Sequence, residues 1–228
     1  MTILDVQMAL SAAGFGPGPL DGIAGPRTRS AIRAFQAQSG LAVDGIAGPK
    51  TQARLFAPTG PLNIPAALPW LAEAKRLIGL TEAAGAADNP VILDWAKAAE
   101  VTFAHDEIPW CGLFMAHCIG SALPEEPLPA NPLSARNWLK FGIDVAPQLG
   151  AILVFWRGSK QGWAGHVALY WGQDADSFHV LGGNQSDSVT VTRIARSRLL
   201  GARWPTSVAP LNLTRTSDMG RDLSTNEA

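Results

Sequence analysis

The chain has 228 residues, of which 47% are hydrophobic and 16% are charged, so it can bury a substantial core. Its formal net charge of −1 gives no electrostatic reason to expect a nucleic acid or an anionic membrane as partner. Two cysteines in so long a chain exclude a disulfide framework. No apolar run approaches the roughly 18 residues of a membrane span, so we expect no membrane insertion.

The first 56 residues predict three short helices, at about 5–13, 26–39 and 49–56. Asp5 is the expected cap of the first helix, and a proline opens each of the other two. Asp21-Gly-Ile-Ala-Gly-Pro26 recurs 23 residues later as Asp44-Gly-Ile-Ala-Gly-Pro49, so each proline follows an Asp-Gly turn. Residues 1–58 are therefore predicted to form a small three-helix domain.

Residues 59–69 are rich in proline and carry no charge, which predicts a semi-extended linker. The second domain is expected at 70–206 and a disordered polar tail at 207–228. Helices are predicted first, at about 70–78, 89–100, 109–119 and 134–140. Five strands follow, at about 150–156, 166–171, 178–181, 189–194 and 200–204. Helices followed by strands without alternation predict an α+β fold with an antiparallel sheet.

Cys111 is the first candidate for chemistry, because it lies in the first turn of the helix predicted at 109–119. Free N–H groups and the helix dipole favour an anion there and lower the pKa of a thiol, which favours the nucleophilic thiolate. The alternative is that Cys111 is a small buried apolar residue. Cys118 lies about 10.5 Å further along the helix axis, too far for a disulfide with Cys111. We interpret it as core packing, and His117 faces another side of the helix.

His166 and Asn184 are the second and third candidates. If a hairpin turns at Asp174–Ala175, His166 at the start of one strand lies opposite Gly183 or Asn184 at the end of the next. The Asn184 amide would then fix the tautomer of the His166 ring and leave the other ring nitrogen for Cys111. The order Cys, His, Asn is that of a papain-like fold. Taken singly, a histidine at a strand start is more often a surface or edge residue, and Gly-Gly-Asn is more often a turn; the conjunction with Cys111 at a helix start favours the catalytic interpretation.

Aromatic residues flank the cysteine and the histidine in sequence. Trp110 and Trp163 would form the walls of a substrate groove, or else pack in the core. The sequence contains no HExxH or CxxC motif and no acidic loop of the EF-hand type, so we predict no metal ion and no cofactor.

Four segments of the first domain resemble the bacterial peptidoglycan-binding module of three helices. They are Val6-Gln-Met-Ala-Leu10, Leu20-Asp-Gly-Ile-Ala-Gly-Pro-Arg-Thr28, Ala31-Ile-Arg-Ala-Phe-Gln36 and Val43-Asp-Gly-Ile-Ala-Gly-Pro-Lys-Thr51. The resemblance implies bacterial peptidoglycan, through its glycan or its stem peptide, as the partner. A generic helical cap or a dimerisation module is the alternative.

Three segments of the second domain, taken in order, resemble the CHAP superfamily of amidases and peptidases: Pro109-Trp-Cys-Gly-Leu-Phe114, Gly165-His-Val-Ala-Leu-Tyr170 and Leu181-Gly-Gly-Asn-Gln185. The resemblance implies a papain-like domain in which Cys111 is the nucleophile, His166 the general base and Asn184 the orienting residue. Trp110, Trp163 and Gln185 are then the expected substrate-binding residues.

The third catalytic residue has alternatives, because many CHAP enzymes carry Glu at that place. Asp187, Asp106 and Glu107 are the reserve candidates, although Asp106 and Glu107 would equally serve to cap the cysteine helix.

Together the two resemblances imply a monomeric peptidoglycan hydrolase of the phage endolysin type, cutting an amide of the stem peptide or its junction with muramic acid. No Lys or Arg precedes Arg27, so we expect no signal peptide and a location in the host bacterial cytoplasm until release to the cell wall. The alternatives are an inactive wall-binding or virion protein, a secreted antibacterial effector, and acyl transfer of the transglutaminase kind.

Overall fold

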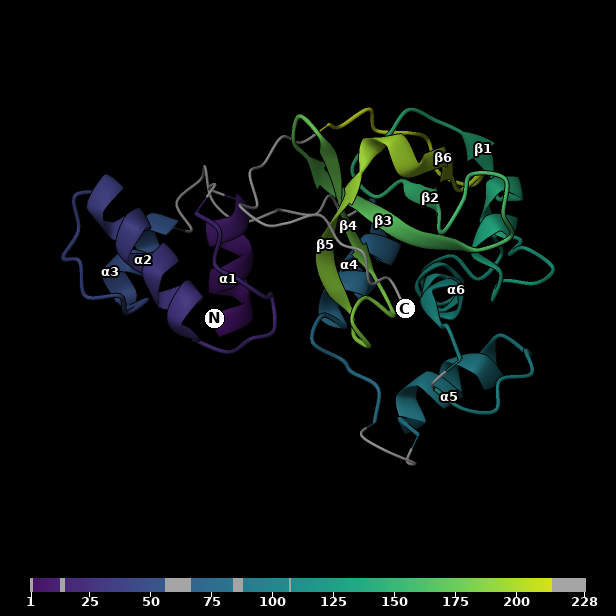
Figure 1. Cartoon of the computed structure of the whole chain (residues 1–228), viewed down its shortest axis with the longest axis horizontal. Coiled ribbons are helices and arrows are strands. Elements are labelled where there is room, and N and C mark those ends of the chain that lie inside the picture. Colours follow the sequence, from purple (N-terminus) through teal and green to yellow (C-terminus); the bar gives the residue numbers. More distant parts are fainter. Residues whose placement is uncertain (1, 13–14, 56–66, 84–87, 107, 215–228) are drawn as a thin grey trace. The chain divides into compact units, whose positions relative to one another are not determined.

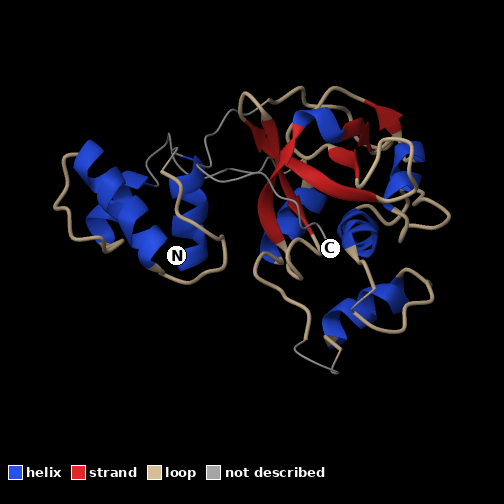
Figure 2. Ribbon diagram, in the orientation of Figure 1, coloured by secondary structure: helices blue, strands red, loops and turns tan. Residues whose placement is uncertain are grey.

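The computed structural model describes residues 2–12, 15–55, 67–83, 88–106 and 108–214. The chain divides into two compact units, one reaching to Asn63 and the other beginning at Ile64. Figure 1 traces the elements along the chain. Figure 2 shows by colour that the first unit is helical and that the second combines helices with a sheet. Residues 59–66 of the predicted linker lie outside the described residues, and the predicted domain bounds stay a prediction.

The first unit consists of α1 (Ile3–Ala12), α2 (Pro26–Gln38) and α3 (Pro49–Leu55), close to the three predicted helices. Pro26 is the first residue of α2, as its fixed φ favours. The predicted cap of α1 is one turn too late. Thr2 donates through its N–H and its hydroxyl to Asp5 Oδ2, and the Asp5 N–H donates to Thr2 Oγ1, which is the reciprocal arrangement of a capping box.

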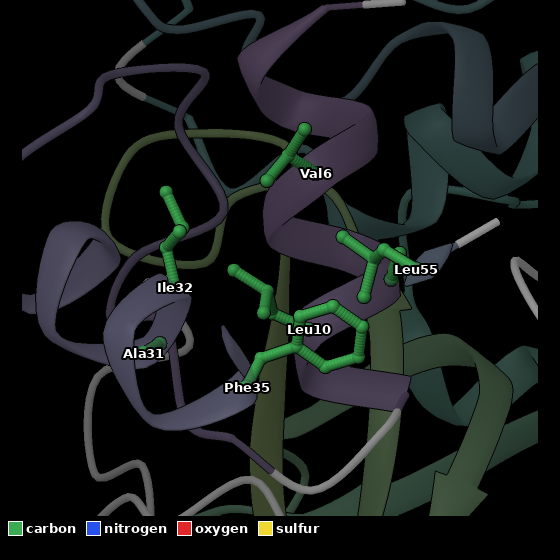
Figure 3. Packing of buried hydrophobic residues seen from close by; sticks show 7 residues of the cluster. Val6, Leu10, Ala31, Ile32, Phe35 and Leu55 are labelled. Atoms are coloured by element: carbon green, nitrogen blue, oxygen red, sulfur yellow. The ribbon is translucent and has the colours of Figure 1, made fainter. Parts of the chain in front are cut away.

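The core of this unit lies between the three helices (Figure 3). Val6 and Leu10 of α1, Ile32 and Phe35 of α2, and Leu55 of α3 converge there, each with less than a tenth of its side chain exposed. Phe15 adds its ring edge-on to that of Phe35, with the centroids 5.5 Å apart. Burial of these apolar side chains stabilises the unit by roughly 1.5–3 kcal/mol for each large residue.

The second unit begins with α4 (Pro69–Arg76), α5 (Pro90–Ala98), α6 (Cys111–Ala122) and the 3₁₀ helix η1 (Ala135–Lys140). Asn89 caps α5 by accepting a hydrogen bond from the Val91 N–H through its side chain. Helix α6 begins two residues later than predicted and continues through Gly120 instead of ending there. None of the helices within the described ranges has the length and apolar character needed to cross a membrane.

Six antiparallel strands form one sheet in the order β1-β6-β2-β3-β4-β5. Their bounds are β1 Ile143–Asp144, β2 Ile152–Trp156, β3 Gly165–Gln173, β4 Ser177–Gly182, β5 Thr190–Ala195 and β6 Leu199–Trp204. Five of the six were predicted, and the two-residue β1 was not. The pairs Leu169–Leu181 and Tyr170–Val180 have the register expected for the β3–β4 hairpin, and the register shifts by one residue beyond Tyr170. The α+β class is thus confirmed.

Helix α6 occupies the centre of the second unit, where it contacts β3 and β4 of the sheet and is flanked by α4 and α5. Its residues from Cys111 to Ala116 and Cys118 to Ile119 are all buried, consistent with a helix that is apolar on every side. The sequence of α6 therefore places its first turn inside the protein, beside the middle strands.

The predicted disordered tail begins too early. The Ser207 N–H donates to Glu126 Oε2 at 2.9 Å, the Asn212 N–H donates to Gln148 Oε1, and the Leu149 N–H donates to the Leu213 carbonyl at 2.7 Å. These bonds hold residues 207–214 against the second unit. Residues 215–228, the rest of the predicted tail, lie outside the described residues.

The half-buried carboxylate of Glu73 links α4 to α6 and is expected to make the stability of the second unit sensitive to acid. Glu73 accepts hydrogen bonds from Arg76 and from His117 Nε2 at 2.7–2.9 Å, and its interaction with Arg76, followed by that with His117, lowers its pKa from 4.5 to about 2. Because the folded pKa lies below the unfolded one, this stabilisation is complete above about pH 4.5 and is lost as the pH falls toward 2.

We therefore expect the free energy of unfolding to fall between pH 4.5 and 3, and Glu73→Gln to flatten this dependence, in urea titrations across that range. Asp94→Asn is the matched control, since its carboxylate is 67% exposed and pairs with Lys97 on the surface of α5. If Glu73→Gln leaves the acid dependence as steep as in the wild type, Glu73 does not carry it.

Candidate active site

Cys111 is the first residue of α6, directly after the N-cap Trp110, and only 3% of it is exposed. The next residue has to be glycine. A Cβ on Gly112 would lie 2.1 Å from the Pro132 carbonyl oxygen and 2.9 Å from that of Leu133. Glycine therefore lets the 132–133 backbone close over the first turn of α6 and bury the thiol.

The predicted lowering of the Cys111 pKa is wrong in direction. Burial of the thiol raises the pKa of Cys111 above its usual value. Hydrogen bonds from the backbone N–H groups of Val167 and Gly112, the positive charge of Arg157 and the residue's own N–H oppose this effect without reversing it. Cys111 at rest is therefore a thiol whose deprotonation requires a base.

His166 lies at the start of β3, paired with Phe155 of β2, and is completely buried. Helix α6 packs against β3, and the backbone N–H of Val167, the residue after His166, is one of the groups that lower the pKa of the Cys111 thiol. The predicted nucleophile and the predicted base are therefore both buried, in elements that pack against each other.

The side chain of Gln185 contacts the ring of His166. His166 Nε2 lies 3.0 Å from Gln185 Oε1, and Gln185 Nε2 donates to the Thr190 carbonyl at 2.5 Å. A carbonyl can only accept, so Thr190 fixes which end of the Gln185 amide faces the ring. In the neutral ring, Nε2 must then carry the proton and Nδ1 the lone pair.

Asn184, the predicted orienting residue, is 2% exposed and directly precedes Gln185, and its role stays a prediction. Gln185, predicted only as substrate-binding, is the residue that contacts Nε2 of His166. The backbone conformation of this segment explains the contact. Strand β4 ends at Gly182, and Asn184, Ser186 and Asp187 all have φ values of 54–57°, in the left-handed region. The chain curls there, and the side chain of Gln185 returns to β3.

Two glycines bring this loop onto α6. A Cβ on Gly183 would lie 2.5 Å from Trp110 Cζ3 and 2.6 Å from Phe114 Cβ, and one on Gly182 would lie 2.8 Å from Ala168 Cβ. The sequence Gly182-Gly183 therefore permits close contact of the loop with the helix that carries Cys111 and with the strand that carries His166.

Trp110 and Trp163 differ in their surroundings. Trp110 is completely buried and donates from Nε1 to Glu82 Oε1 at 2.6 Å, so core packing is its role and the prediction that it lines a substrate groove is wrong. Trp163 is 90% exposed, in the connection between β2 and β3. Its contact with a substrate stays a prediction.

The reserve candidates have other positions. Asp106 is 1% exposed and its Oδ2 accepts from the N–H groups of Ala83 and Asn89 at 3.0 and 2.8 Å, so it fixes the segment before α5 and neither caps α6 nor serves the ring of His166. Asp187 lies in the exposed part of the loop after β4. Glu107 lies outside the described residues.

Other histidines of the second unit pair with carboxylates. His179 Nε2 lies 2.8 Å from Asp174 Oδ2, which also accepts from Arg193, and His105 lies 3.3 Å from Asp88. Among the residues that the structure describes, no three His, Cys, Asp or Glu side chains are grouped so that they could hold a metal ion.

Comparison with known protein families gives a match for the first unit of the chain. Residues 2–55 match the family model described as a putative peptidoglycan binding domain. The match spans α1, α2 and α3, and it supports a peptidoglycan-binding module in the first unit. No curated protein and no solved structure matches the chain.

Proposed function

We propose that this chain is a cysteine-dependent peptidoglycan hydrolase of the endolysin type, in which the second unit has papain-like chemistry. The target is an amide of the wall stem peptide or its junction with muramic acid. The observation that carries the proposal is the packing of α6, which begins at Cys111, on the strand that carries His166, whose ring lies 3.0 Å from Gln185. The peptidoglycan-binding match of the first unit supports the choice of polymer.

In the proposed reaction Nδ1 of His166 takes the proton of the Cys111 thiol, and the sulfur attacks the amide carbonyl carbon. The positive ring then gives this proton to the leaving amine, and an acyl-thioester remains on Cys111. Nδ1 next removes a proton from water, whose oxygen attacks the thioester carbonyl carbon. The carbon–sulfur bond breaks, the acid leaves, and the ring returns the proton to the sulfur. Gln185 Oε1 accepts a hydrogen bond from Nε2–H throughout and keeps the ring in place.

The negative charge that develops on the substrate carbonyl oxygen during the attack needs hydrogen-bond donors to stabilise it. The N–H groups of the first turn of α6 are suited to this, because the first four N–H groups of a helix have no partner within it. The first unit holds the protein at an insoluble polymer and so raises the effective concentration of the hydrolase there. Release from the host cytoplasm to the wall would bring both units to their substrate.

A wall-binding protein without hydrolytic activity is the second candidate. The observation that favours it is the burial of Cys111, which leaves 3% of the residue exposed and raises the pKa of its thiol. In this case the first unit alone would account for wall association.

Incubation of the full chain with purified peptidoglycan tests the proposal. We expect the turbidity to fall and mass spectrometry to find fragments with one new amine and one new carboxylate per cut, which also identifies the bond. Sedimentation of the protein with the polymer, without clearing, would establish the second candidate instead. Transfer of an added amine onto the fragments would show acyl transfer.

A further inference from the structure

Each copy of the repeat in the first unit is held from inside by one glutamine. Gln7 and Gln36 are both almost completely buried. The amide of each donates to an aspartate, a carbonyl and a threonine, and accepts from the glycine after the aspartate. The first set is Asp21, Ile23, Thr28 and Gly22, and the second is Asp44, Ile46, Thr51 and Gly45, at 2.7–3.1 Å.

Both turns also present the same side chain to solvent. Ile23 and Ile46 are each 66% exposed, although each contributes its backbone to the glutamine network. Their side chains therefore do not stabilise the turns. Exposed apolar side chains at equivalent places in two rigid turns are suited to contact with a ligand.

The two copies differ in what surrounds this isoleucine. Beside Ile46 lies a pocket of about 360 Å³, within the range of small-ligand sites, and its other lining residues include Leu41 and Lys50. The equivalents of these two in the first copy are Gly18 and Arg27. Arg27 Cβ lies 2.9 Å from the place a Gly18 Cβ would take, so the stem of Arg27 covers the corresponding position.

The lining of the pocket suggests the ligand. Leu41, Ala42, Ile46 and Pro49 form aliphatic walls, and Asp44 and Lys50 supply one charge of each sign. None of the lining residues is aromatic, whereas sugar rings are commonly bound by stacking on aromatic faces. The wall stem peptide carries methyl side chains, carboxylates and, at its diamino acid, an amine, which matches aliphatic walls with both signs of charge.

We propose that the pocket at the second repeat copy binds the stem peptide of peptidoglycan, and that the first copy has a structural role. This inference rests on the wall-binding function proposed above and adds the place and the part of the polymer that is bound.

Sedimentation of the full chain with purified peptidoglycan tests the site, in a Cys111→Ala background that keeps the polymer intact. The two isoleucines are matched in residue type, exposure and backbone network. We expect Ile46→Ser to raise the Kd by about tenfold, because an apolar contact is lost, and Ile23→Ser to change it by less than about twofold. Lys50→Gln, a second variant on the exposed rim, is also expected to weaken binding, by about threefold.

Equal effects of the two isoleucine variants, or a larger effect of Ile23→Ser, would overturn the assignment of the pocket. Free stem peptide is expected to compete the protein off the polymer, and peptide-free glycan chains are not. Competition by glycan chains alone would overturn the choice of ligand. Failure of the parent Cys111→Ala chain to sediment with peptidoglycan would instead overturn the wall-binding function itself.

Discussion

Cys111→Ala is expected to lower the rate of peptidoglycan clearing by at least about 10³-fold, because in the proposed reaction the thiol is the group that attacks the amide carbonyl. The two cysteines of α6 provide a matched pair. Both are buried free thiols on one helix, but Cys118 lies in its later turns, where burial raises its pKa well above the usual value. Cys118→Ala is therefore expected to keep the clearing rate within about threefold while lowering stability by about 1 kcal/mol.

Turbidity loss on purified peptidoglycan measures the rates, and thermal unfolding of each variant checks the fold. If Cys111→Ala clears as fast as the wild type, the hydrolase proposal fails. If both alanine variants lose activity together with cooperative unfolding, the effect belongs to the packing of α6.

Gln185→Ala is expected to lower kcat by about 10²-fold with little change in KM, because in the proposed reaction this buried side chain holds the base. A rise in KM would instead support the predicted contact of Gln185 with the substrate. The variant removes the Gln185 Oε1 atom that accepts the hydrogen bond from Nε2–H of His166. ¹⁵N shifts of the His166 ring should show protonated Nε2 in the neutral wild-type ring, and a mixture of tautomers in the variant.

Asn184→Gly is the control for this prediction. Asn184 has a φ of 55°, which glycine adopts without strain, so the variant removes the amide and leaves the backbone in place. We expect its activity within about threefold of the wild type. If Asn184→Gly loses as much activity as expected for Gln185→Ala, and Gln185→Ala does not, the third residue is Asn184 after all.

Local chemistry made much of the fold predictable. Pro26 and Pro90 stand at the start of helices because their geometry suits that place and few others. The hairpin register that pairs Leu169 with Leu181 follows from the position of the turn at Asp174, and it was sufficient to bring His166 near the loop at Asn184.

The other features of the fold and of the candidate site depend on packing and on contacts between distant residues, which the spacing of residues in the sequence does not show. The contact of Gln185 with His166 depends on a loop in which Asn184, Ser186 and Asp187 have φ values of 54–57°, a conformation uncommon in residues other than glycine. The raised pKa of Cys111 reflects how deeply α6 is buried, which is a property of the packed unit and not of the helix start. The ordered segment 207–214 is held by Glu126 and Gln148, both at least 60 residues earlier in the chain.

In the second repeat copy, the side chain that holds the turn is not one of those that line the pocket. Gln36 holds the turn through buried atoms and backbone groups, while the side chains of Ile46 and Lys50, which line the pocket, lie outside that network. Mutations at these two positions therefore leave the hydrogen bonds that hold the turn in place. The lining of the pocket can change in evolution, with the scaffold beneath it unchanged.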